Sequence, residues 1–493
     1  MDPRLSSCDQ GSDEADPGRP RRPFLALLVA SGGFVIVLDS FAANVAFPRL
    51  QTAFPDTPRS TLAWAATGYS ITLAALLLVA GALGDRYGRR NVFLIGMAAF
   101  AVGGVFSAMA PNPAWLITTR IAQGCAGALM ISTSIALGIA EYPAERRGVA
   151  MGWMGVMGSI ASLIGPILAG NVISIGGSWR WVFLAPVPIA AIVLFAGPRV
   201  LHAGRDAGAA REPIDGVGVV LVVAASGLLT FAIQQTGQWG WIDRRTLSTL
   251  TASVVLAWLF VLRCQRSPTP LLRLSLFADR RYLVASLSQL GSQFSIFAFF
   301  FWTPLFLINV WGWQASTVGW VVAIPLLVSM GSMQVGRYTD LRGHRGVLVV
   351  GGFLGAGSSL WWFLTVGAEP SFAHSLLPGI LLFGVSISLV GITSAAAALS
   401  QVQPANLATA NSAFQTGRRL VQTLGVAVVV ALLGDRSTDS VERFRLVWIV
   451  AGIGFVLSSV TALWFPARPG PANPRRTGDR RPKPKSPAST ARR

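Results

Sequence analysis

The sequence predicts an all-α membrane protein with 14 transmembrane helices, arranged as two six-helix bundles related by a parallel repeat plus two inserted helices. Three observations predict this fold class. Apolar residues make up 52% of the 493 residues and charged residues only 12%, whereas an ordinary soluble domain carries about 25% charged residues. Fourteen stretches reach the length of about 20 apolar residues that a membrane-crossing helix needs. One loop signature recurs in both halves of the chain.

The connectors between the predicted spans are short, and none could form a separate soluble domain. The spans cover approximately 24–47, 61–83, 91–110, 114–140, 148–173, 181–198, 216–236, 246–262, 282–308, 315–336, 346–366, 375–398, 406–434 and 446–466. We divide the chain into an N-terminal tail (1–22), an N-terminal bundle (23–198), an inserted helix pair with its loops (199–281), a C-terminal bundle (282–466) and a basic tail (467–493). The last segment has the proline-rich, charged composition of a disordered region.

The net charge of +19 is explained by membrane topology. With the N-terminus placed inside the cell, the inner segments hold 29 Lys and Arg residues and the outer loops hold 8. This bias follows the positive-inside rule and predicts a cell-membrane protein with both termini in the cytoplasm. The spans exclude a nucleic-acid-binding protein, and the basic tail is suited to contact with anionic lipid.

The recurring loop signature lies on the cytoplasmic side of both halves. The first copy reads Gly81-Ala-Leu-Gly-Asp85-Arg86-Tyr-Gly88-Arg89-Arg90, and the second reads Gly336-Arg-Tyr-Thr-Asp340-Leu-Arg342-Gly343-His344-Arg345. The offset of 255 residues pairs spans 1–6 with spans 9–14, a parallel repeat of the kind found in some transporters. We interpret the loops as a cytoplasmic gate in which an aspartate caps a helix or pairs with an arginine across the helix gap. The alternative is a basic turn that only fixes topology. The candidate gate residues are Gly81, Asp85, Arg86, Gly88, Arg89, Arg90, Asp340 and Gly343.

Asp39 is the one carboxylate deep in a predicted span. A charge at the bilayer centre costs at least about 2.5–3.5 kcal/mol, so such a residue is a functional candidate by default. Asp39 lies about 12 Å and Arg120 about 9 Å from the outer ends of their spans, at about 1.5 Å per residue. We expect the two side chains to face the central cavity as a coupled pair that carries the proton. The alternative is a static pair that only fixes helix packing.

A polar stripe in the thirteenth span is formed by Asn411, Gln415, Arg418 and Gln422, whose spacing of 4, 3 and 4 places them on one helix face. Such a stripe is costly against lipid, so it should line the cavity or a helix contact. Interhelical hydrogen bonding and substrate contact remain equal alternatives. The candidate substrate-cavity residues are Asn44, Tyr69, Gln123, Gln289, Gln293, Asn411, Gln415 and Arg418.

Four motifs resemble signatures of the major facilitator superfamily. The first gate loop resembles the signature GxLaDrxGrk, and Arg120-Ile-Ala-Gln123-Gly124-Cys-Ala-Gly127 resembles RxxQGxgaA. Gly165-Pro166-Ile-Leu-Ala169-Gly170 resembles the antiporter signature GPxxGG, and Leu38-Asp39-Ser40-Phe41-Ala-Ala-Asn44-Val-Ala-Phe-Pro48 is close to LDxTIVNVALP of the fourteen-helix drug:proton antiporters. The resemblance covers about residues 24–466, with departures at Phe41, Ala169 and Val421.

The resemblance implies a monomeric proton-coupled antiporter that exports drugs or amphipathic small molecules across a bacterial cell membrane by alternating access. Its energy source is the proton gradient, and it needs no metal or other cofactor. The resemblance also implies that Gly165, Pro166 and Gly170 form an outward-side seal; the alternative is an ordinary packing kink at a proline inside a span. Other functions left open are a dedicated exporter of one metabolite, antibiotic or siderophore, proton-coupled uptake, and passive facilitation.

The sequence argues against an enzyme or an ATP-driven pump. No HExxH, GxSxG or GxxxxGK[ST] pattern is present. The three histidines, His202, His344 and His374, all fall in predicted loops, and the three cysteines show no metal-ligand spacing. The expected partners are therefore a small-molecule substrate, protons and membrane lipid.

Overall fold

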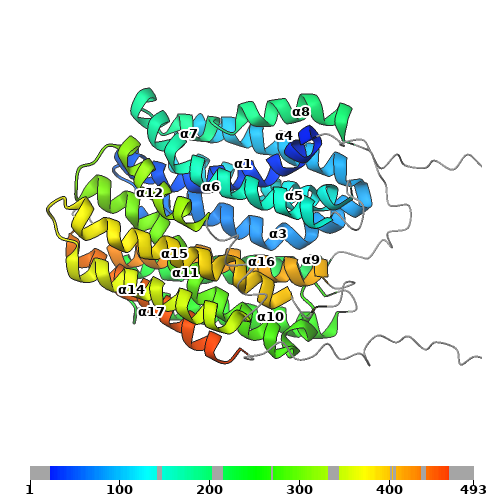
Figure 1. The fold of residues 1–493 in the computed structure, drawn as a ribbon. Helices are drawn as coiled ribbons and strands as arrows, with labels where there is room; N and C mark the ends of the chain where they lie inside the picture. The colour runs from blue at the N-terminus through cyan, green and yellow to red at the C-terminus, as the bar shows by residue number, and fades with distance from the viewer. Residues whose placement is uncertain are drawn as a thin grey trace, which may run out of the picture.

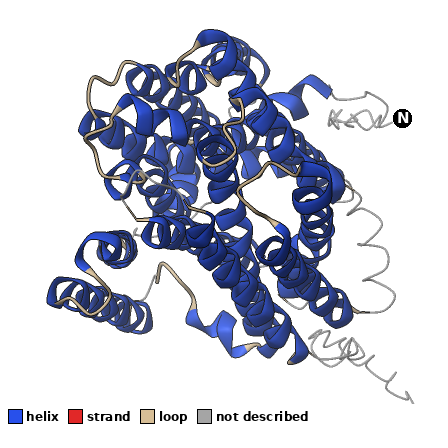
Figure 2. Ribbon diagram, turned by 90° about the vertical axis from the view of Figure 1, so that its left-hand side faces the viewer, coloured by secondary structure: helices blue, strands red, loops and turns tan. Residues whose placement is uncertain are grey.

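The structure is a computed structural model, and it describes residues 23–140, 147–201, 215–267, 270–330, 343–399, 402, 407–434 and 440–465. All regular elements in these ranges are helices (Figure 2). Thirteen helices in the described part are long and apolar enough to cross a membrane. A fourteenth apolar helix, α12 (Ala315–Ser329), is shorter, and residues 331–342 that follow it lie outside the described ranges. Each of the fourteen predicted spans thus coincides with a helix.

The N-terminal half forms one group of helices that run side by side (Figure 1). It contains α1 (Pro23–Ala53), α2 (Arg59–Leu62), α3 (Trp64–Tyr87), α4 (Arg89–Ala108), α5 (Pro113–Ala140), α6 (Arg147–Gly176), α7 (Arg180–Leu184) and α8 (Val187–Val200). The short helices α2 and α7 lead into α3 and α8, so the half provides six spans. Helices suit this environment because they satisfy all backbone hydrogen bonds internally, which lipid requires.

The C-terminal half forms the second group. It contains α11 (Arg280–Asn309), α12, α14 (His344–Thr365), the π-helix η3 (Phe372–Leu376), α15 (Leu377–Leu399), α16 (Leu407–Leu433) and α17 (Val441–Leu463). Along the chain, the two halves are separated by α9 (Gly216–Trp239), α10 (Arg244–Arg266) and the 3₁₀ helix η2 (Leu274–Ala278).

Helix contacts confirm the parallel repeat. Within the first half α1 packs on α6, α3 on α5, and α4 on α5 and α8; within the second, α11 packs on α16, α12 on α15, and α14 on α15 and α17. Between the halves α6 packs on α12 and α3 packs on α16, while α1 packs on its own counterpart α11. In the repeat, α3 corresponds to α12 and α6 corresponds to α16, so the α6–α12 and α3–α16 contacts are equivalent. The two bundles are therefore related by a pseudo-two-fold axis.

The two gate glycines show the repeat in backbone geometry. Gly88 precedes α4 with φ +93°, and Gly343 precedes α14 with φ +85°. Positive φ is readily available only to glycine, which explains why this residue occurs at both positions, 255 residues apart. The third span of each bundle therefore begins directly after a glycine in this conformation.

The contact between α6 and α12 brings two backbones together. A Cβ placed on Gly170 would overlap the carbonyl oxygen of Ala315, and one on Gly319 would overlap the carbonyl oxygen of Pro166. The Ser174 hydroxyl also accepts a hydrogen bond from the backbone nitrogen of Ser316 at 3.1 Å. Small residues permit this close approach between membrane helices.

The inserted pair packs on one side of the bundle interface through α9. This helix contacts both α3 and α16, whereas α10 packs mainly on α9. Asp215 caps α9 by accepting from the backbone nitrogen of Gly218 and pairs with Arg263 of α10 at 3.1 Å, so it closes the hairpin. α9 also makes a polar contact with the N-terminal bundle: the Gln234 amide donates to the Thr67 hydroxyl of α3 at 3.2 Å.

We predict that Gly170→Ala destabilises the protein, because its Cβ meets backbone atoms that cannot move independently. Forced overpacking of this kind costs about 1–3 kcal/mol. Thermal unfolding in detergent measures the effect. Gly158→Ala is the matched control, since it lies in the same helix and nothing lies within 4 Å of its Cβ position. Equal unfolding midpoints for the two variants would contradict the prediction.

Candidate functional site

Asp39 and Arg120 form a buried ion pair between α1 and α5. Arg120 Nη1 lies 3.0 Å from Asp39 Oδ1 and 2.9 Å from Oδ2, and each residue is only 1% exposed. The sequence-based depth estimate thus placed them correctly relative to each other. Both carboxylate oxygens contact a single guanidinium nitrogen, so the pair lacks the two-nitrogen fork typical of strong arginine–carboxylate contacts. Oδ2 accepts no well-directed hydrogen bond from any described residue.

Arg120 makes further contacts besides the ion pair. Nε donates to the Ala65 carbonyl at 3.1 Å, and Nη1 donates to Gln123 Oε1 at 2.9 Å. Its Cζ lies 4.3 Å from the centre of the Tyr69 ring and 5.2 Å from that of Phe183, within the range of cation–π attraction. Arg120 therefore ties α3 to α5 and α1 and has little freedom to change rotamer.

Gln123 supports Arg120 from inside the N-terminal bundle. Its amide donates to the Phe100 carbonyl at 3.1 Å, and its Oε1 accepts from the Ser107 hydroxyl at 3.3 Å as well as from Arg120. A Cβ on Gly103 would overlap the Gln123 side chain, so the glycine makes room for it. Gln123 was a candidate cavity residue, but the structure places it behind Arg120 as a positioning residue.

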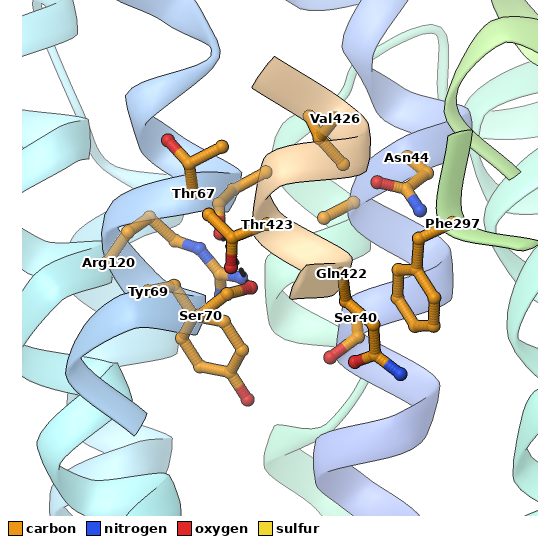
Figure 3. Close-up of a pocket in the computed structure, with 12 residues that line it drawn as sticks. Ser40, Asn44, Thr67, Tyr69, Ser70, Arg120, Phe297, Gln422, Thr423 and Val426 are labelled. Carbon is orange, nitrogen blue, oxygen red and sulfur yellow. Dashed lines mark hydrogen bonds between the residues drawn. The ribbon is translucent and has the colours of Figure 1, made fainter. Parts of the chain in front are cut away.

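A small, partly open cavity lies between the two bundles beside the ion pair. Figure 3 shows Arg120, Thr67 and Tyr69 on one side, α16 in the middle, and Asn44 and Phe297 on the other. Its lining residues are Ser40, Ala43, Asn44, Ala66, Thr67, Tyr69, Ser70, Arg120, Phe297, Gln422, Thr423 and Val426. They come from α1, α3, α5, α11 and α16, so both halves of the molecule contribute.

Of the predicted cavity residues, Asn44 and Tyr69 line this space, and Arg120 does so as well. Gln293 instead accepts from the Gln422 amide at 2.7 Å within the C-terminal bundle, and Gln289 accepts from the Ser394 hydroxyl at 3.5 Å. The other predicted residues, Asn411, Gln415 and Arg418, lie on α16 before Gln422 and do not line the cavity.

The gate loops are described only in part. The side chain of Asp85 and all of Asp340 lie outside the described residues, so their proposed contacts stay predictions. Gly81 lies within α3, Arg86 is exposed near its end, and Arg89 begins α4. Arg90 donates to the Pro198 carbonyl at 2.6 Å, which caps α8 within the same bundle.

The predicted seal residues lie where α6 meets two neighbours. A Cβ on Gly165 would lie 3.1 Å from the Leu38 carbonyl oxygen of α1. Pro166 and Gly170 form the contact with α12 described above. These three residues therefore hold α6 against a helix from each bundle.

Sequence reasoning missed Thr67, Ser70 and Thr423, short polar residues that resemble ordinary helix positions. It also assigned no role to Gln234, which is 1% exposed and bonded to the cavity residue Thr67. The signal was present, since a glutamine pair interrupts the otherwise apolar span 216–236.

Removing one member of the ion pair should destabilise the fold more than removing both. Arg120→Gln leaves the Asp39 carboxylate buried and uncompensated, a change that costs about 3–5 kcal/mol in proteins. The double variant Asp39→Asn, Arg120→Gln should recover most of this loss in equilibrium unfolding. If both variants unfold alike, Asp39 carries no charge that Arg120 compensates.

The bond between the inserted pair and the cavity can be tested at Thr67. Thr67→Val leaves the buried Gln234 amide without its acceptor, and an unsatisfied buried polar group costs about 1–3 kcal/mol. Thr72→Val is the control, because the hydroxyls of Thr67 and Thr72 both donate to the carbonyl four residues earlier, but only Thr67 accepts from α9. Thermal unfolding should show a larger loss for Thr67→Val, and adding Gln234→Leu should remove the excess. An equal loss for both threonines argues against the bond.

Known proteins resemble this chain in sequence and in architecture. The family pattern described as Major Facilitator Superfamily matches residues 29–426. The chain is 33% identical over 429 residues to the tetracenomycin C resistance and export protein of Streptomyces glaucescens, covering 86% of this chain and 77% of that protein. It is 30% identical to the multidrug resistance protein Stp of Mycobacterium tuberculosis, covering 85% and 78%.

Solved transporters share the fold. The inward-open xylose transporter XylE from E. coli superposes with a TM-score of 0.63 at 15% identity, covering 91% of this chain and 97% of that chain. The nucleoside transporter NupG gives a TM-score of 0.61 at 13% identity, covering 90% and 100%. Together with the family pattern, which spans most of the sequence, these matches establish that the chain belongs to the major facilitator superfamily of multi-pass membrane transporters.

Proposed function

We propose that this protein is a proton-coupled antiporter that exports drugs or amphipathic small molecules across the cell membrane by alternating access. The observation that carries the proposal is the buried Asp39–Arg120 pair at the edge of a cavity between the two bundles. Arg120 lines this cavity and Asp39 lies directly behind it, and an intramembrane ionisable residue beside such a space is the expected place for a proton relay.

The geometry of the pair suits reversible protonation. Oδ2 of Asp39 touches the same nitrogen as Oδ1 and lacks a well-directed hydrogen bond of its own. A proton on Oδ2 therefore displaces no hydrogen bond, yet it removes the charge that holds α1 to α5. Arg120 keeps its bonds to Ala65 and Gln123 in either state, so α1 is the element released.

Movement of the bundles about this site supplies alternating access. The proposed moving units are 23–198 and 282–466, with the inserted pair 199–281 between them. The reciprocal contacts of α3 with α16 and α6 with α12 form two seams on which the bundles can rock. We place both termini in the cytoplasm, which is supported by the distribution of basic residues and by α1 and α17, which begin and end toward the same side (Figure 1).

Small-molecule export is supported by the relatives and by the cavity. The relatives are named for tetracenomycin C resistance and export and for multidrug resistance, and a further one, 27% identical over 90% of this chain, for methylenomycin A resistance in Streptomyces coelicolor. The cavity combines hydroxyl and amide groups with Phe297 and Val426, a lining suited to a partly apolar organic molecule. Because two relatives are named for one antibiotic each, a dedicated antibiotic exporter is the second candidate.

Asp39→Asn tests the proton coupling. Adding tetracenomycin C or methylenomycin A to purified protein in weakly buffered detergent should release protons from the wild type and none from the variant, while binding of the compound persists. Asp56→Asn, which removes an exposed carboxylate between α1 and α2, should behave as the wild type. Proton release from Asp39→Asn equal to that of the wild type would exclude Asp39 as the coupling group.

A further inference from the structure

Two adjacent arginines lie in the middle of α16. Arg418 and Arg419 are the twelfth and thirteenth of its 27 residues, far from either helix end. Among the described residues, the one carboxylate at mid-span is Asp39, and it is occupied by Arg120. No salt bridge joins either α16 arginine to a described carboxylate, and Arg418 Nε is buried without a hydrogen-bond partner there. The central region thus holds two positive charges that no described acid compensates.

Arg419 lies on a face of α16 that borders the cavity, although it is not itself among the lining residues. Thr423 and Val426, four and seven residues later on the same face, both line it. Thr416, three residues earlier, donates to the Ala74 carbonyl of α3 at 3.4 Å, so this face of α16 looks toward the N-terminal bundle. Arg419 is buried, with 8% of its surface exposed.

We propose that Arg419, with Arg418 beside it, binds the anionic group of the exported molecule, and that the substrate is an amphipathic organic anion such as a carboxylate or an ionised phenol. This inference rests on the proposed export function and names its substrate class. A guanidinium buried away from water gains most from a planar anion, which it can bind through two parallel hydrogen bonds.

The rest of the cavity fits the other end of such a molecule. Ser70 and Thr423 place hydroxyl groups in the cavity, each donating to a carbonyl four residues earlier in its helix, and Phe297 and Val426 add apolar surface. A cationic compound finds no free carboxylate among the described mid-span residues, because Asp39 is paired. The site therefore discriminates by the charge of the ligand.

Three probes with the same aromatic ring test the proposal: naphthylacetate, naphthylacetamide and naphthylethylammonium. Equilibrium dialysis against the purified full-length protein in detergent gives a Kd for each. We expect the anion to bind at least about tenfold more tightly than the neutral amide, a ratio that corresponds to a single charge-assisted contact. The cation should bind most weakly.

Variants then assign the preference to Arg419. Arg419→Gln should weaken binding of naphthylacetate to the level of the amide and leave amide binding unchanged, while Arg419→Lys should retain the preference for the anion. Arg445→Gln, which removes an exposed arginine of α17, is the matched control and should bind all three probes as the wild type does.

The proposal is overturned if wild-type protein binds the anion no better than the amide, or binds no anion at any soluble concentration. It is also overturned if Arg419→Gln weakens all three probes alike, since that marks a structural role. Competition by phosphatidylglycerol that removes anion binding but not amide binding would assign the arginines to lipid phosphate instead. If the wild-type protein releases no protons on adding a compound but still prefers the anionic probe, the result counts against proton coupling and leaves the anion site standing.

Discussion

The architecture of the N-terminal bundle depends on how one carboxylate is kept in a membrane interior. Asp39 requires a cation, and Arg120 supplies it from α5 while also bonding the backbone of α3 at Ala65. Gln123 and two aromatic rings then fix the guanidinium. Because so many contacts converge on one group, the relative positions of three helices follow from a single electrostatic constraint. The cavity is the side of this cluster that the N-terminal bundle leaves open toward α16.

The two seams between the bundles are related by the repeat but differ in chemistry. At α6–α12 the backbones touch through Gly170 and Gly319, which makes a tight contact that depends on the absence of side chains. At α3–α16 the helices meet through polar groups such as Thr416 and are covered by α9, whose Gln234 bonds Thr67. The proposed rocking movement would slide smooth surfaces at the α6–α12 seam, whereas at the α3–α16 seam it would have to accommodate the inserted pair.

The fold could be predicted from the sequence because a membrane requires long apolar spans and a bias of arginine toward the cytoplasmic side. The recurrence of Gly88 and Gly343 then revealed the repeat. The depth of Asp39 and Arg120 followed from the constant rise of a helix. Side-chain direction did not follow, which is why Gln123 was assigned to the cavity although it lies behind Arg120. Thr67 and Gln234 were missed because their partnership spans 167 residues and exists only once α9 packs on α3.

The charges around the cavity also constrain how protons and substrate are exchanged. A proton on Asp39 makes the region more positive, and next to Arg418 and Arg419 this strengthens rather than weakens attraction for an anion. Electrostatics alone would therefore favour binding of the proton and the anion at the same time, whereas antiport requires that they bind alternately. In an exporter of anions, exchange has to act through helix position: protonation releases α1 from Arg120, and the bundles reorient before the proton leaves. The membrane potential assists in that case, because an anion leaving an inside-negative cell gains about 2.3 kcal/mol per 100 mV.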